Sequence, residues 1–188
     1  VLPERAVRCL SPHATWQDEW WKGRVIEAVS GQGYEEFVQR EILQPIGVRG
    51  MRLGRSLPEQ RWPKEVHYYD QRGRTGFAAV APGRRVESGY THDQEVLDAH
   101  GGWVASAQDL ARFAAAFADP AASPLLSEAS IERMWARPAG AEGKVWYGMG
   151  WSVRELSEGR LNAWHSGPLT GGTSTLFVRR HDGYTWSI

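Results

Sequence analysis

The chain has 188 residues but only one cysteine, Cys9, together with three lysines and one asparagine. A single cysteine cannot form an internal disulfide or build a metal site alone, which excludes a cysteine-based framework. No stretch reaches the roughly 20 apolar residues of a membrane span, and the N-terminus has no apolar signal-peptide core. The 22 basic and 22 acidic residues balance to a net charge of zero. We therefore expect neither a nucleic-acid partner nor a polybasic membrane anchor.

The rest of the composition is that of an ordinary globular protein. Hydrophobic residues make up 41% of the chain and charged residues 23%, and the length suits about one domain. The sequence starts at Val1 and stops at Ile188, inside an alternating apolar run. We therefore expect it to be a piece of a longer protein.

Four segments have the spacing or the boundary residues of helices. Apolar residues recur at helical spacing over residues 23–29 and 34–42, and glycine or proline follows each stretch. Ser106 and Asp109 form a capping pattern at the start of a third helix, which Pro120 ends. A shorter helix is predicted to begin at Ser127.

The last third of the chain changes to the two-residue period of β-strands. Residues 147–153, 161–165, 173–180 and 184–188 are predicted strands, and Asp182-Gly183 between the last two predicts a hairpin. Residues 48–100 indicate a long surface excursion with a short strand-like piece at 66–69. Helices first and an antiparallel meander last predict an α+β fold, with an antiparallel β-sheet flanked by helices.

Several motifs of catalysis and cofactor binding are missing from the sequence. There is no Gly-x-Ser-x-Gly nucleophile elbow, no His-Glu-x-x-His and no phosphate loop ending in Gly-Lys-Ser/Thr. Four polar residues of one loop could in principle hold a metal ion: His92, Asp93, Asp98 and His100. Because they lack the spacing of a ligand motif, we interpret them as solvated residues and expect neither a metal nor a cofactor.

A polar corner of small residues interrupts the predicted strands. Residues 164–167 end one strand and residues 171–173 open the next. Backbone and hydroxyl donors at such a strand edge can bind a carboxylate or a developing oxyanion. The same residues also fit an ordinary turn, whose glycines adopt positive φ and whose His165 is merely exposed. The residue pattern alone leaves both interpretations open.

Four segments, in order along the chain, resemble one protein family. They are residues 23–47, 65–70, 98–113 and 165–180, with the stretches Glu-Val-His-Tyr-Tyr-Asp, His-Gly-Gly-Trp-Val and His-Ser-Gly. Together they are similar to the serine β-lactamase and penicillin-binding-protein superfamily, on its class C-like esterase and D-peptidase side. The resemblance covers residues 23–188 and leaves residues 1–22 as a non-resembling N-terminal segment. It implies an incomplete β-lactamase/transpeptidase-like fold.

The resemblance implies acyl transfer through a serine ester, with an ester, a peptide or a β-lactam as substrate and no cofactor. Ser-x-x-Lys supplies the nucleophile and an amine, Tyr-x-Asn supplies a proton-transfer tyrosine, and a Lys/His-x-Gly strand positions the substrate carbonyl. Only the last part can be carried over, and it makes His165, Ser166 and Gly167 the substrate-binding residues. Members are often exported or periplasmic, but nothing in this sequence fixes the localisation.

The scarcity of lysine and asparagine excludes the other two motifs from this chain. Three residues before the lysines at 22, 64 and 144 stand Glu19, Arg61 and Ala141. Two residues before Asn162 stands Arg160. The resemblance also implies an oxyanion-binding N–H just after the His-x-Gly triplet, and Pro168 at that position has none. Either Leu169 takes over after a one-residue shift, or this donor is missing.

We therefore expect a catalytically incompetent fragment of a β-lactamase-related serine hydrolase. The alternative is a non-catalytic module that binds a peptide or a β-lactam at the His165 corner. A third interpretation is a gene fragment without function, which a cooperative thermal unfolding transition would argue against. Missing parts of the fold would leave strand edges and apolar faces exposed, which favours self-association.

Overall fold

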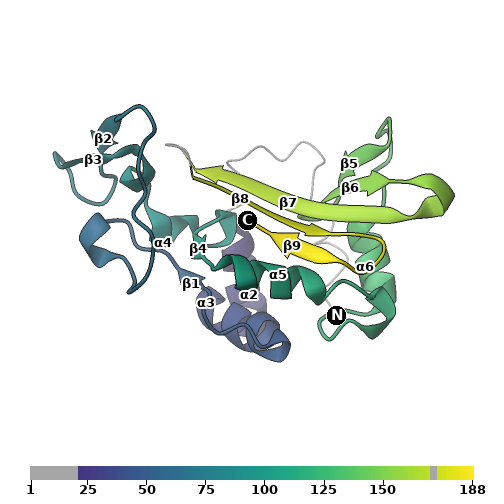
Figure 1. Ribbon diagram of the computed structural model, residues 1–188. Coiled ribbons are helices and arrows are strands. Elements are labelled where there is room, and N and C mark those ends of the chain that lie inside the picture. The colour runs from purple at the N-terminus through teal and green to yellow at the C-terminus, as the bar shows by residue number, and fades with distance from the viewer. Residues whose placement is uncertain (1–20, 170–172) are drawn as a thin grey trace.

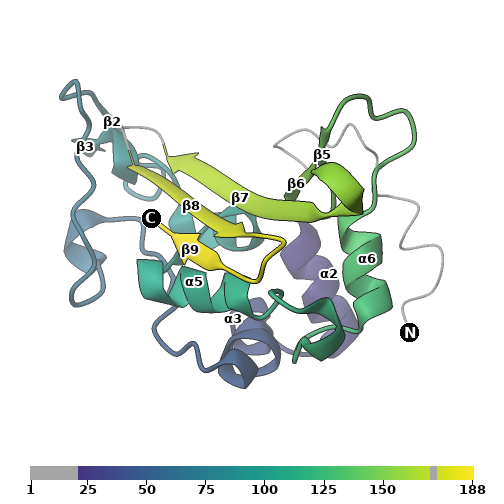
Figure 2. The same cartoon turned by 45° about the vertical axis from the view of Figure 1, so that its right-hand side comes forward.

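The computed structural model describes residues 21–169 and 173–188 (Figure 1). This part consists of a five-stranded antiparallel sheet, helices along one side of the sheet, and a lobe of short elements (Figure 2). The expectations for residues 1–20, and for Gly171 and Gly172 at the polar corner, lie outside the described residues. No helix of the described part is long and apolar enough to cross a membrane.

The N-terminal helices follow the predicted pattern with one change of helix type. Helix α2 spans Trp21–Ser30 and helix α3 spans Tyr34–Phe37. The second helix continues as a π-helix over Val38–Leu43 and a 3₁₀ turn over Gln44–Ile46. Gly47 ends it with a φ of 72°, a left-handed conformation that glycine adopts without strain. The predicted helix and its end are confirmed.

Residues 48–100 belong to the lobe, whose regular elements are all short. Strand β1 (Arg52–Leu53) pairs with β4 (Trp103–Val104). Strand β2 (Thr75–Phe77) pairs with β3 (Arg85–Glu87). Helix α4 spans Gln94–Leu97. Most of this segment is irregular, as the sequence predicts.

The predicted strand at residues 66–69 is wrong, because these residues have no regular structure. The Tyr68 hydroxyl donates to the Glu65 carboxylate (2.9 Å), and the Tyr68 N–H donates to the Tyr90 hydroxyl (3.0 Å). Tyr90 is 1% exposed and packs in the small core of the lobe. Bonds to side chains, rather than to a neighbouring strand, therefore fix this piece of backbone.

A buried carboxylate, that of Asp70, fixes the next turn of the lobe. It accepts hydrogen bonds from the Ser88 hydroxyl, the Arg72 N–H (2.8 Å), the Arg74 N–H (3.1 Å) and the Arg74 guanidinium (3.0 Å). These bonds, the one from Ser88 above all, hold the pKa of Asp70 well below its usual range, because they stabilise the charged form. The turn therefore depends on an ionised carboxylate.

The two helices that pack against the aromatic core of the sheet begin at the serines that the sequence predicts. Helix α5 spans Ala107–Ala115, and the Ser106 hydroxyl oxygen accepts the Asp109 N–H (3.1 Å). Helix α6 spans Glu128–Trp135 and is capped by Ser127 through the same kind of bond (3.3 Å). Each bond satisfies one backbone donor of a first helical turn. Both predicted starts are confirmed.

The sheet has the strand order β5-β6-β7-β8-β9, and every neighbouring pair is antiparallel. In chain order, its strands are Val145–Tyr147, Ser152–Glu155, Leu161–Leu169, Thr173–Arg179 and Thr185–Ser187. The turn between β8 and β9 contains Gly183, with a φ of 85°. The predicted meander, its last hairpin and the α+β class are confirmed.

The predicted single strand at residues 147–153 is wrong, because a hairpin divides this segment between β5 and β6. The Gly148 N–H donates to the Trp151 carbonyl (2.8 Å), and Gly150 has a φ of 78°. A Cβ atom at Gly148 would collide with the Met134 carbonyl of α6. In the sequence, Gly148 and Gly150 look like the small-residue face of one strand. In the structure, Gly150 is needed for the turn and Gly148 for close packing on α6.

An aromatic cluster fills the space between the sheet and helices α5 and α6. Trp151 is 4% exposed, and its ring centre lies 5.2 Å from that of Phe117, 5.1 Å from that of Phe177 and 6.0 Å from that of Trp135. Burying one aromatic side chain stabilises a fold by roughly 4–6 kcal/mol as an upper estimate. This cluster holds the sheet on the two helices.

A buried arginine, Arg179 of β8, links the sheet to both helices. It is 6% exposed, and its guanidinium donates to the carbonyls of Phe117 (3.0 Å), Ala118 (2.8 Å) and Leu161 (2.9 Å). The guanidinium also lies 4.9 Å from the centre of the Trp135 ring. Phe117 and Ala118 follow the end of α5, where the helix dipole favours a cation.

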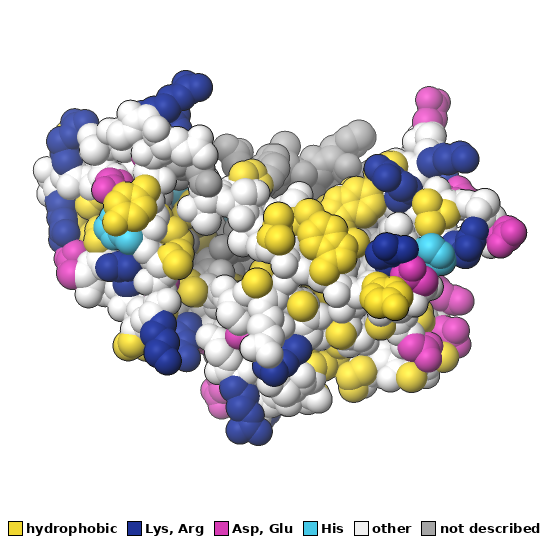
Figure 3. All heavy atoms as spheres, in the orientation of Figure 1, with side chains coloured by type: hydrophobic (Ala, Val, Ile, Leu, Met, Phe, Trp, Pro, Cys, Tyr) yellow, Lys and Arg dark blue, Asp and Glu magenta, His cyan; other side chains and the backbone are white. Residues whose placement is uncertain are grey.

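The other face of the sheet exposes apolar side chains. The cross-strand register places Tyr147, Trp164, Val178 and Trp186 in one row on this face. Tyr147 is 51% exposed and Trp186 43%. Figure 3 shows hydrophobic side chains gathered over the sheet. We call this surface the outer face.

Replacing Arg179 with methionine should destabilise the fold by roughly 3 kcal/mol, because three carbonyls, one of them buried and two partly buried, lose their donor. The neighbouring Arg180→Met change removes only an exposed pair with Asp182 (2.6 Å) and should cost less than about 1 kcal/mol. Urea unfolding of the two variants measures both values. Equal losses would contradict the role of the buried guanidinium.

The stability of the chain should fall as the pH drops below about 4, the usual pKa of an aspartate. Asp70 has a lowered pKa in the folded state, so its contribution is present above that pH and is lost as the carboxylate becomes protonated. The Asp70→Asn variant should be less stable at pH 7 and should lose less stability between pH 6 and pH 3. Melting temperatures across this range test the difference, and parallel curves would refute it.

Candidate functional site

Residues 164–167 of the predicted polar corner lie on β7, the longest strand of the sheet, and Thr173 opens β8. Residues 164–167 do not end β7 as expected, because the strand continues through Pro168 to Leu169. On one side β7 pairs with β6 only as far as Trp164, and on the other it pairs with β8 over residues 163–169. Residues 165–169 thus have one side with no strand partner among the described residues. We call this side the free edge of β7.

The free edge exists because the chain turns away from β7 just before β6 begins. Gly150, with its positive φ, lies in that turn. Its carbonyl accepts a hydrogen bond from the His165 Nδ1 (2.9 Å). A carbonyl cannot donate, so Nδ1 carries a proton, and Nε2 of the neutral ring remains an acceptor. The sequence-predicted site residue His165 is therefore held by a turn that the sequence did not predict.

The His165 ring lies at the margin of the aromatic core and is partly buried. Its centre lies 6.1 Å from the centre of the Phe177 ring, with 27° between the planes, and 6.3 Å from that of Tyr147. His165 and Phe177 are cross-strand partners on β7 and β8. Packing and one hydrogen bond together fix the orientation of the ring.

Hydrogen bonding between β8 and β9 determines which backbone groups point to the free edge. Leu176 and Ile188 exchange both of their backbone hydrogen bonds (3.0 and 2.9 Å), so Leu176 directs its N–H and C=O away from β7. Ser166 is the β7 partner of Leu176 and must direct its own N–H and C=O away from β8, toward the free edge. Pro168, two residues further along, has the same orientation.

Pro168 leaves the free edge short of one donor. Proline has no N–H, and strands tolerate it where that side of the backbone has no partner. Leu169 does not replace it, because Leu169 stays in register with Thr173 and directs its groups toward β8. Of the two alternatives that the sequence left open, the register supports the missing donor.

Both aspartates among the polar loop residues considered as metal ligands have other partners. Asp93 caps α4 by accepting a backbone N–H (3.1 Å), and Asp98 pairs with Arg24 of α2. No group of three or more His, Cys, Asp or Glu side chains in the described ranges is placed to hold a metal ion. The structure therefore does not bring Asp93, Asp98, His92 and His100 together as one site.

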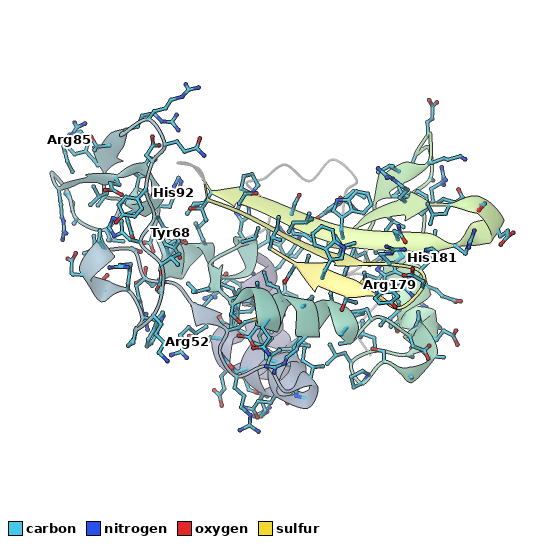
Figure 4. All side chains as sticks on the ribbon, viewed as in Figure 1. Arg52, Tyr68, Arg85, His92, Arg179 and His181 are labelled. Carbon is cyan, nitrogen blue, oxygen red and sulfur yellow. The ribbon has the colours of Figure 1, made fainter. Side chains whose placement is uncertain are left out.

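Two hollows in the described part lie away from the His165 motif. One, of about 540 Å³, lies between α6 and the ends of the sheet strands, next to Arg179 and His181 (Figure 4). The other, of about 520 Å³, lies beside α2 and α3 and is lined by several carboxylates, among them Glu27 and Asp98. Sequence reasoning missed both, because residues far apart along the chain form them.

Comparisons with known proteins assign the chain to a family. A family model described as Beta-lactamase matches residues 17–188. The chain belongs to the beta-lactamase family. The match includes β7 with its His-Ser-Gly motif, and it confirms the resemblance of the four segments. The comparison with curated proteins found no match.

Several solved structures share the fold. A D-stereospecific amidohydrolase from Streptomyces sp. is 22% identical, with a TM-score of 0.66 over 93% of this chain and 48% of its own. A D-amino acid amidase from Ochrobactrum anthropi SV3, complexed with D-phenylalanine, is 17% identical, with a TM-score of 0.66 over 93% and 49%. An octameric penicillin-binding protein homologue from Pyrococcus abyssi is 24% identical, with a TM-score of 0.57 over 88% and 35%.

These similarities show that the chain has a beta-lactamase-like fold, and they show how much of each solved structure it covers. The chain spans about half the length of the first two of these structures and about a third of the other. The predicted β-lactamase-like fold is confirmed, and this chain covers only part of it.

Replacing His165 with alanine should destabilise the chain by about 1 kcal/mol, because the Gly150 carbonyl loses its donor. His165→Asn places an amide near the position of Nδ1 and should recover part of that loss. Urea unfolding measures both variants. If asparagine were as destabilising as alanine, ring packing rather than the hydrogen bond would hold the turn.

Proposed function

We propose that this chain is the substrate-binding part of a beta-lactamase-family serine hydrolase, and that it is catalytically inactive as given. The complete enzyme would hydrolyse an ester, a peptide amide or a β-lactam through an acyl-enzyme. The carrying observation is the free edge of β7. There, His165, Ser166 and Gly167 match the family's His-x-Gly strand, and the Ser166 N–H and C=O point away from β8, toward the free edge.

The inactivity rests first on the missing nucleophile. An acyl-enzyme needs a serine activated by a nearby base, and no Ser-x-x-Lys or Tyr-x-Asn occurs in the sequence. Proximity of such groups supplies much of the acceleration of acyl transfer, and a histidine on its own supplies only a general acid or base. His165 has its Nδ1 committed to Gly150, which suits binding and positioning.

The inactivity rests secondly on Pro168. A tetrahedral intermediate needs backbone or side-chain donors at the position of its oxyanion, and removing one such donor costs on the order of 3–4 kcal/mol. Pro168 has no N–H, and Leu169 points the other way. A nucleophile added to this edge would still meet an incomplete oxyanion site.

The substrate class that we propose is a peptide-like amide, in particular a D-amino acid amide. This follows from two structural neighbours, a D-stereospecific amidohydrolase and a D-amino acid amidase. Both share the fold at 22% and 17% identity, so the substrate is carried over by analogy. A strand edge with exposed backbone groups suits a ligand that has a peptide backbone.

A second candidate is a non-catalytic module that binds a peptide or a β-lactam without reacting with it. The observation that favours it is the combination of an intact strand edge with absent catalytic motifs. The two candidates agree that the chain alone does not acylate. They differ in whether binding by this chain is its function or a remnant of an enzyme.

Self-association through the sheet belongs to the same proposal. The outer face exposes Tyr147 and Trp186. The strand β9 has no charged residue and no proline to discourage pairing with another strand. We also propose an N-terminal boundary of the family-like domain near residue 23, close to residue 17, where the family match begins.

The purified chain should release no burst of product from a chromogenic ester or β-lactam, because it has no activated serine. Rapid mixing followed by absorbance measures the amplitude. A burst of one equivalent per chain would overturn the proposed inactivity. Saturable binding of a penicillin without acylation, abolished by His165→Ala, would favour the binding module over the enzyme part.

A further inference from the structure

The free edge of β7 offers an unequal set of hydrogen-bonding groups. Ser166 directs one N–H and one C=O toward it, and Pro168 directs only a C=O. The edge therefore has one donor and two acceptors. Any other residue at position 168 would add a second donor two residues from the first.

An extended peptide that continued the line of β6 would lie along this edge. Strand β6 runs antiparallel to β7 and starts at Ser152, opposite Trp164, and the turn at Gly150 leaves the next positions unoccupied by a strand of the described part. The ligand residue opposite Ser166 would exchange two hydrogen bonds with it. The ligand residue opposite Pro168 would donate its N–H and find no donor for its own C=O.

We propose that Pro168 is a specificity-determining residue of this edge. Because proline has no N–H, the edge has only one backbone donor and favours an extended peptide segment, whose own N–H groups can bind the two carbonyls of the edge. The ligand must supply two N–H groups, on residues two apart, and only one of its carbonyls is bound. A peptide meets this requirement, whereas a carboxylate or an oxyanion, which supplies acceptors alone, does not. The inference rests on the proposed substrate-binding role of β7.

The ligand side of the pairing can be tested with a capped trialanine, N-acetyl-(Ala)₃-N-methylamide, prepared from L- and from D-alanine. Its first and third residues would face Pro168 and Ser166. N-methylation of either residue should weaken binding about five-fold, because one hydrogen bond is lost. N-methylation of the central residue, whose N–H points away from β7, is the matched control. Titrations followed through the Ser166 amide in ¹H–¹⁵N spectra give the affinities.

The protein side is tested with Pro168→Ala, which restores the missing N–H. This variant should bind the capped trialanine about five-fold more tightly and show a new amide signal that shifts with the ligand. Leu169→Ala, at a position whose N–H faces β8, should leave the affinity unchanged. The thermal transition of each variant verifies that it is folded.

Two results would overturn the inference, and they are distinguishable. Binding at Ser166 that is indifferent to Pro168→Ala, or to N-methylation of the first ligand residue, refutes the role of Pro168 and leaves the proposed site standing. If no form of the peptide shifts the Ser166 amide in the folded wild-type chain, the substrate-binding role of β7 fails as well.

Discussion

The buried guanidinium of Arg179 is the interaction on which the arrangement of sheet and helices depends. A cation can be buried only where acceptors surround it, and here those acceptors are backbone carbonyls after α5 and at the start of β7. Helix α6 contributes the face of Trp135. One side chain thus fixes two helices and two strands relative to one another.

The position of the candidate site follows from this anchor. Arg179 is the β8 partner of Ala163, which is 0% exposed and part of the core. His165 lies two residues further along β7, so it has the same face of the sheet as Ala163 and reaches the margin of the core. The Ser166 side chain lies on the opposite face of the sheet, and the Ser166 N–H and C=O point toward the free edge. The register that Arg179 helps to fix therefore also fixes which backbone groups a ligand can meet.

Sequence reasoning succeeded where a feature depends on residues close together in the chain. The start of α5 at Ser106 is a side-chain cap within one turn, and the β8–β9 hairpin depends on Asp182-Gly183 between two alternating runs. It failed where distant contacts decide. The turn at Gly150 and the close approach of Gly148 to α6 divide an alternating run that looks like one strand. Nothing in the sequence around Arg179 indicates that its side chain is buried.

The candidate site divides in the same way. The His-Ser-Gly motif is local and was recognisable, but the free edge depends on where β6 begins and on the pairing of β8 with β9. The absence of Ser-x-x-Lys could be settled by counting lysines, because it is a property of the sequence and not of the fold. The missing backbone donor at Pro168 could be recognised only from the sequence and the structure together. Its lack of an N–H is visible in the sequence, but only the strand register shows that the missing group faces the free edge and that Leu169 faces away.

Under the proposed function, this division explains how a chain of about half the length of two structural neighbours would keep one part of an active site. Substrate recognition along a strand uses backbone groups of a single element. Strand β7 is one such element, and the Gly150 carbonyl and the Phe177 ring fix its His165. Acyl transfer uses side chains from several elements that must meet within hydrogen-bond distance. When part of a fold is lost, the first kind of function persists as long as one strand keeps its register, whereas the second is lost with any one of its elements. Under the same proposal the edge of β7 is also altered, because at Pro168 it can accept hydrogen bonds but has no N–H to stabilise an oxyanion.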